Sequence, residues 1–113
     1  MLKLTGYDIY KKALVRLSYK DFENKLSLKA LEFINQICID LKLPNVQSLS
    51  QNIDLSADVA EAVCLGLMML LTLSEGDSEK NIIYTNLYNA KRASVLSKIV
   101  YVEDVLPNTQ NGG

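Results

Sequence analysis

With no histidine in the sequence, the residues whose grouping first suggests chemistry are carboxylates and hydroxyls. Glu75, Asp77 and Glu79 lie within one short turn, close enough to bind a hard cation or to share a proton. Their spacing lacks the ordered oxygen positions and the final bidentate glutamate of a calcium-binding loop. A solvated turn that also caps a helix accounts for them without a metal ion.

Nucleophilic catalysis has equally little support. Three hydroxyl residues surround the turn, namely Thr72, Ser74 and Ser78, but no histidine and no catalytic lysine pattern is nearby to activate them. Gly6, Gly66 and Gly76 stand isolated, so the chain has no glycine loop that could cradle a phosphate. We therefore expect no enzymatic activity, no cofactor and no bound metal.

Basic residues form two small groups, Lys11, Lys12 and Arg16 in one and Lys91 with Arg92 in the other. Each group either lies on a solvated helix face, follows a phosphate backbone, or pairs with acidic residues of a neighbouring copy. Twelve Lys and Arg against thirteen Asp and Glu give a net charge of −1, which argues against strong DNA binding by the isolated chain. A small helical DNA-binding, DNA-packaging or regulatory module that uses the first group remains the alternative function.

Tyrosine is the third notable residue type. Its six copies, Tyr7, Tyr10, Tyr19, Tyr84, Tyr88 and Tyr101, fall mostly in the expected first and last helices. Tyrosine is favoured where a buried edge meets water or a partner. Packing at the edge of the core and contact with another subunit are the two interpretations.

Four helices account for most of the apolar periodicity. The first begins at Thr5, whose hydroxyl can cap the amide of Asp8. After a polar connection over residues 20–25, Ser27 is expected to cap a second helix that Pro44 stops. Residues 45–55 are irregular, and we expect a loop that packs three apolar anchors against the bundle: Leu49, Ile53 and Leu55.

The third helix is the most apolar part of the chain. Ser56 is its expected cap, and it is hydrophobic nearly all round from Ala62 to Leu73. Such a helix needs partners on every side, so it is either the centre of the bundle or meets another subunit with one face. The uncharged stretch from Ala62 to Ser74 is shorter than the roughly 20 residues of a membrane span. We therefore expect a buried core helix and no membrane partner.

The last helix follows a turn at Gly76, a residue suited to a left-handed cap. One side of it carries Ile83, Leu87, Ala90 and Val95. The following segment is rich in β-branched residues, and we expect an extended arm, whose apolar members are Val100, Tyr101, Val102, Val105 and Leu106. Residues 107–113 are expected to form a flexible tail.

Composition fits this outline. A chain of 113 residues with 49% apolar and 22% charged residues fits one globular domain, here residues 1–106. Five glycines and two prolines are too few for a turn-rich all-β fold. Cys38 and Cys64 each lie in an apolar stripe and are expected to be buried free thiols. No signal peptide is recognisable at the start. The sequence therefore predicts an all-α fold, a small bundle of about four helices with a long loop after the second.

One arrangement of residues resembles a known family. Glu75-Gly76-Asp77 follows an apolar helix, and the run Asn86-Leu87-Tyr88-Asn89-Ala90-Lys91-Arg92-Ala93-Ser94 comes next, before Val102-Glu103-Asp104-Val105-Leu106-Pro107. With the opening from Thr5 to Leu14 and the helix from Ala30 to Leu41, this pattern is similar to the head–tail connector (adaptor or head-completion) proteins of phages and prophages of Gram-positive bacteria. The resemblance covers most of the chain, through packing and turn motifs.

The resemblance implies a helical subunit that assembles with copies of itself into a ring. Such a ring docks between the portal and the tail-proximal neck proteins, and DNA passes through it non-specifically. The expected location is the virion, after assembly in the cytoplasm of the bacterial host. We expect the face shared by Tyr84, Tyr88, Lys91 and Arg92 to meet a neighbouring subunit or the channel, and the arm to reach a neighbour.

Overall fold

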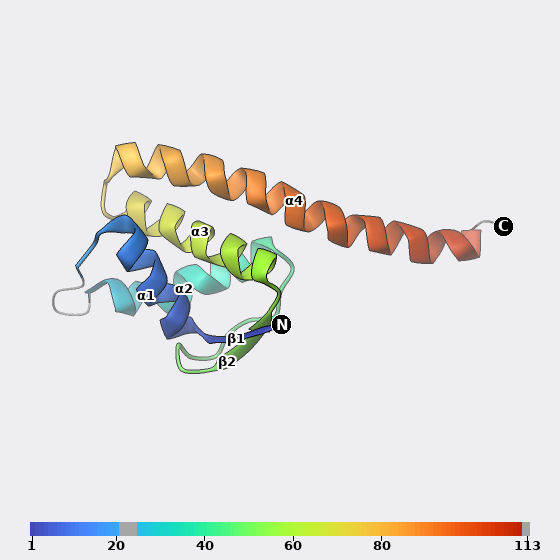
Figure 1. Ribbon diagram of the computed structural model, residues 1–113, viewed down its shortest axis with the longest axis horizontal. Coiled ribbons are helices and arrows are strands. Elements are labelled where there is room, and N and C mark those ends of the chain that lie inside the picture. The colour runs from blue at the N-terminus through green and yellow to red at the C-terminus, as the bar shows by residue number, and fades with distance from the viewer. Residues whose placement is uncertain (21–24, 112–113) are drawn as a thin grey trace.

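The computed structural model describes the backbone of residues 1–20 and 25–111 and the side chains of residues 1–20 and 25–98. It confirms a small, mostly α-helical bundle. The elements in chain order are β1 (Leu2–Thr5), α1 (Gly6–Leu17), α2 (Lys25–Asp40), β2 (Asn52–Leu55), α3 (Ala57–Ser74) and α4 (Ser78–Asn111). The molecule is elongated, with principal extents of 59 × 30 × 19 Å, because α4 is longer than the bundle (Figure 1).

Helix α1 begins as the sequence predicts. The Thr5 hydroxyl accepts a hydrogen bond from the Asp8 amide at 3.1 Å, and the Asp8 carboxylate accepts one from the Thr5 amide at 2.9 Å. This reciprocal capping box satisfies two backbone donors that the first helical turn would otherwise leave unpaired. At the other end, Ser18 adopts a left-handed conformation with φ 59° and closes the helix.

Helix α2 begins at Lys25, two residues before the predicted cap at Ser27. It ends at Asp40, and Lys42 then takes a left-handed conformation with φ 61° ahead of Pro44. The end of this helix before Pro44 is therefore confirmed. Residues 21–24 of the predicted polar connection lie outside the described residues.

The segment after α2 contains a strand that the sequence analysis missed. Residues Asn52–Leu55 pair antiparallel with Leu2–Thr5, so that Leu2 lies opposite Leu55 and Leu4 opposite Ile53. Asn35 holds the loop before it, since its side chain bonds both the amide and the carbonyl of Val46. Leu55 is buried and the other two predicted anchors, Leu49 and Ile53, pack against the core as expected.

Helix α3 is the centre of the bundle. It packs against α1, α2 and α4, and Ser56 caps it by accepting a hydrogen bond from the Val59 amide. Its length and composition alone would suit a membrane span, but more than half of it is buried inside this fold. Of the two roles open to this helix, the central one is the one observed.

Helix α4 runs antiparallel to α3 after a turn in which Gly76 has φ 69° (Figure 1). Its final part continues beyond the bundle as the projecting ribbon at the C-terminal end of Figure 1. The expected extended arm, Val100 to Leu106, is therefore wrong: it is helical, and so are residues 107–111 of the expected tail. β-Branched residues favour a strand mainly where they can pack within a sheet, and no sheet lies beside this segment among the described residues. A helix that has already formed gains one hydrogen bond for each residue added, so α4 continues. Residues 112 and 113 lie outside the described residues.

Candidate functional site

The basic group on α1 is largely engaged inside its own chain. The Arg16 guanidinium donates two hydrogen bonds to the Glu61 carboxylate on α3, at 2.9 and 2.8 Å, and the Lys12 amine lies 3.8 Å from the same group. The hydrogen bond to Glu61 raises the pKa of Arg16, and the same contact lowers the pKa of Glu61. Within the described residues Lys11 has no ion pair and is exposed. The structure thus separates Lys11 from the other two.

The predicted contact face of α4 lies against α2. Tyr88 is 2% exposed, and its hydroxyl donates to Asp40 Oδ2 at 2.5 Å. The Arg92 Nε donates to the same oxygen at 2.7 Å. Burial raises the pKa of Asp40, but the hydrogen bonds from Tyr88 and Arg92 together have the larger effect, so its pKa is lowered. Burial and the Asp40 bond together raise the pKa of Tyr88, which therefore stays a neutral donor at physiological pH.

The same face also holds the start of α3. Asp58 lies in the first turn of α3, and its two oxygens accept from Lys91 and Lys98, each at 2.9 Å. These hydrogen bonds lower the pKa of Asp58 to about 2. Tyr84, one turn before Tyr88, is half-buried and packs against the core. The four side chains expected to meet a neighbour thus all have contacts within their own chain, and Tyr88 is the one that is fully buried.

This outcome corrects the assignment of the two sides of α4. Tyr88 is too buried to contact another subunit in this conformation, and Lys91 and Arg92 have carboxylate partners within the chain. The predicted apolar side divides, because Val95 is buried whereas Ile83, Leu87 and Ala90 are exposed. The spacing of the residues would have indicated the packed face, because positions 84, 88, 91 and 95 follow the i, i+4, i+7, i+11 pattern of one side of a helix. We call the exposed residues Ile83, Leu87 and Ala90 the outer stripe of α4.

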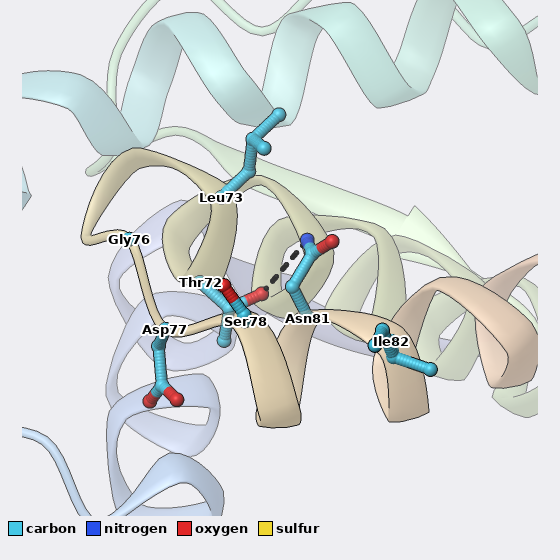
Figure 2. Close-up of a pocket in the computed structure, with 7 residues that line it drawn as sticks. All are labelled: Thr72, Leu73, Gly76, Asp77, Ser78, Asn81 and Ile82. Carbon is cyan, nitrogen blue, oxygen red and sulfur yellow. Dashed lines mark hydrogen bonds between the residues drawn. The ribbon is translucent and has the colours of Figure 1, made fainter.

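A cavity of about 290 Å³ lies between the end of α3 and the start of α4, beside the acidic turn. In Figure 2, Asn81 leans toward Thr72, Asp77 points toward α1, and the exposed side chains of Leu73 and Ile82 point away from Thr72. The Asn81 amide donates to the Thr72 hydroxyl at 3.2 Å and to the Met69 carbonyl at 2.9 Å. These polar groups therefore tie α3 to α4, which is a structural role.

One carboxylate of the acidic turn, Asp77, is bound by side chains of its own chain. The Tyr19 hydroxyl donates to Asp77 at 2.5 Å, and the Lys80 amine lies 3.8 Å from the same carboxylate. In the described part of the chain no three His, Cys, Asp or Glu side chains are grouped closely enough to hold a metal ion. Asp77 thus links the segment just after α1 to the α3–α4 turn.

Both cysteines are buried free thiols, as predicted. Burial raises the pKa of Cys38 and of Cys64, so neither favours the reactive thiolate. Arg16 also approaches the Cys64 sulfur at 3.6 Å. Cys64 is thus packed beneath the Arg16–Glu61 pair and acts as a small apolar residue.

The ion pairs of Asp58 with Lys91 and Lys98 should make a contribution to stability that acid removes. Because its pKa is lower in the folded chain than the ordinary 3.8, its contribution is complete above pH 4 and disappears as the pH falls toward 2. Urea unfolding of Asp58→Asn should therefore show lower stability than the unmodified chain at pH 7 and a smaller loss between pH 4 and 2. Asp54→Asn, at an exposed position in β2, is the control. Equal pH slopes for Asp58→Asn and the unmodified chain would contradict the prediction.

Comparisons with protein families, with curated proteins and with solved structures found no match to this chain.

Proposed function

We propose that this protein is a structural assembly subunit, a head–tail connector of a phage or prophage. In this proposal copies of the chain form a ring between the portal and the tail-proximal neck proteins, and DNA passes through without sequence recognition. The virion is its final location, after assembly in the host cytoplasm. The sequence resemblance supplies the family, and α4 supplies the physical support.

The main observation is the length of α4. Its 34 residues extend about 51 Å at 1.5 Å per residue, and the part after residue 98 adds about 20 Å beyond its last ion pair with α3. A helical extension of that length is marginally stable in water without packing partners. Packing against a second molecule would stabilise this extension, and a neighbouring subunit in an assembly is such a molecule.

The outer stripe of α4 supports the same function. Ile83 and Leu87 are large apolar side chains about half exposed, and Ala90 continues the stripe by one turn. Apolar residues repeated at i, i+4 and i+7 form a continuous face that another helix can cover. The apolar character of α3 is not an argument for assembly, because the chain's own helices cover most of its surface.

The geometry gives the DNA-binding alternative less support. Two of the three cations on which it depends, Lys12 and Arg16, share the Glu61 carboxylate. A phosphate contact by either would compete with that ion pair, which leaves Lys11 as the unengaged cation of the group. A single lysine supplies little of the charge that phosphate backbones require.

The direct test is the absolute mass in solution, by light scattering after gel filtration at low and high protein concentration. The proposal expects a discrete ring-sized species that grows with concentration. A clean monomer at every concentration would contradict self-assembly of this chain and leave the proposal dependent on a partner protein.

A paired variant tests the outer stripe. Ile83→Glu combined with Leu87→Glu should raise the concentration needed for assembly by at least about tenfold, since losing about 1.4 kcal/mol of contact energy changes an association constant by that factor. The matched control is Leu28→Glu combined with Ile39→Glu, which changes two exposed apolar residues of α2. Equal effects of the two pairs would show that the stripe is not a specific contact.

A further inference from the structure

The projecting end of α4 is acidic, whereas the exposed face of α1 is apolar and basic. We propose that residues 100–111 of one copy dock on the α1 face formed by Tyr7, Lys11 and Val15 of a second copy. This inference rests on the proposed function and names the contact that would join neighbouring subunits.

The α1 face is an exposed strip of the helix. Tyr7, Lys11 and Val15 follow one another at i, i+4 and i+8, so they lie along the same side. Val15 is 78% exposed and Tyr7 nearly half exposed, so both leave apolar surface uncovered in the single chain. The strip offers two apolar contacts with an amine between them.

Charge favours the end of α4 as the occupant. From residue 99 to residue 111 the sequence contains Glu103 and Asp104 but no lysine or arginine. The α1 face presents Lys11, which has no ion pair among the described residues, whereas the exposed Lys12 beside it already lies 3.8 Å from Glu61. Asp8, the carboxylate of the same region, is already bonded to the Thr5 amide. An acidic and apolar helix therefore complements this face better than a neutral or basic one.

A second pair of exposed apolar residues is a poorer match. Leu73 and Ile82 flank the α3–α4 turn, where Glu75, Asp77 and Glu79 would repel an acidic segment. Lys80 offsets only Asp77. The α1 face therefore suits the end of α4 better than these residues do, in charge as well as in apolar character.

Geometry makes the contact intermolecular. In Figure 1 the end of α4 projects away from the bundle, at the opposite side from the C-terminal end of α1. A contact between two different surfaces of identical copies is heterologous, and it generates a closed ring when the rotation between copies is suitable. A contact of α4 with α4 would instead pair two copies and stop.

Zero-length carbodiimide cross-linking tests the inference, because it joins lysine amines to carboxylates that already touch. An equal mixture of ¹⁵N-labelled and unlabelled full-length chains identifies intermolecular products by mass spectrometry. We expect mixed-isotope peptides that link Lys11 or Lys12 with Glu103 or Asp104. Mixed-isotope links confined to other residues, or none at all, would overturn the inference.

Charge exchange provides the second readout. Lys11→Glu should lower the yield of the cross-linked complex formed through Lys12, and reduce assembly, by about tenfold, and adding Glu103→Lys should restore assembly. Lys42→Glu, at an exposed lysine after α2, is the control. Equal behaviour of Lys11→Glu and Lys42→Glu would overturn the inference.

The two proposals can fail separately. A ring-sized mass with cross-links elsewhere would overturn the α1 docking contact and leave the connector function standing. The expected cross-links without a ring-sized mass would support the contact and contradict ring assembly by this chain. The absence of both would overturn the docking contact and would contradict self-assembly of this chain.

Discussion

Gly66→Val should destabilise the fold by about 3 kcal/mol or more. A Cβ atom at position 66 would lie 2.7–2.9 Å from three side-chain atoms of Ile37, at the contact of α3 with α2. Overpacking of a close core commonly costs about 1–3 kcal/mol, and valine adds two further methyl groups at the same place. Because Ile37 is branched at Cβ, its Cγ atoms cannot swing aside freely. Urea unfolding measures the loss.

A double variant separates this clash from a change in helix propensity. Ile37→Ala removes the atoms that a valine at 66 would meet, so Gly66→Val should cost much less in that background than in the unmodified chain. Gly66→Ala gains about 1 kcal/mol of helix propensity, which partly offsets its smaller clash. A cost of Gly66→Val that stays the same with Ile37→Ala would contradict the close contact.

Features that depend on neighbours in the sequence were predictable. Thr5 and Ser56 were expected as caps, Gly76 as a left-handed turn residue and Pro44 as a stop, and the structure confirms each. All four depend on hydrogen bonds or backbone preferences within a few residues. Local physics was therefore enough for them.

The two-stranded sheet was missed because its evidence is not local. Each strand has four residues, and Leu4 meets Ile53 across about half of the chain. Both strands alternate apolar and polar residues, but four residues are the shortest run in which alternation indicates a strand. Only the closed bundle brings the start of the chain beside β2, so tertiary structure decided an element that propensity could not.

The inner and outer sides of α4 were exchanged for a different reason. The sequence analysis treated Tyr88, Lys91 and Arg92 as surface residues because their polar groups suggested solvent or a partner. In the structure those polar groups meet Asp40 and Asp58, which lie at the end of α2 and the start of α3. A sequence does not show which distant carboxylates a helix will meet, so the polar face was taken for the outer one.

Leu67→Ala is the second large effect we expect, and it tests whether the fold itself satisfies the most apolar helix. Leu67 is fully buried at the centre of α3, where truncation to alanine removes core contacts and leaves a cavity. Such changes cost about 2–5 kcal/mol. Leu73→Ala on the same helix is the matched control, because Leu73 is 65% exposed and should cost less than about 0.5 kcal/mol.

Chemical unfolding at a concentration where the chain is monomeric gives both values. A large loss for Leu67→Ala with almost none for Leu73→Ala means that α1, α2 and α4 cover α3 within one copy. A small loss for Leu67→Ala would mean that α3 is not packed this way in the isolated chain. Its apolar surface would then have to be covered by another molecule, and the contacts that join subunits would centre on α3 instead of α4.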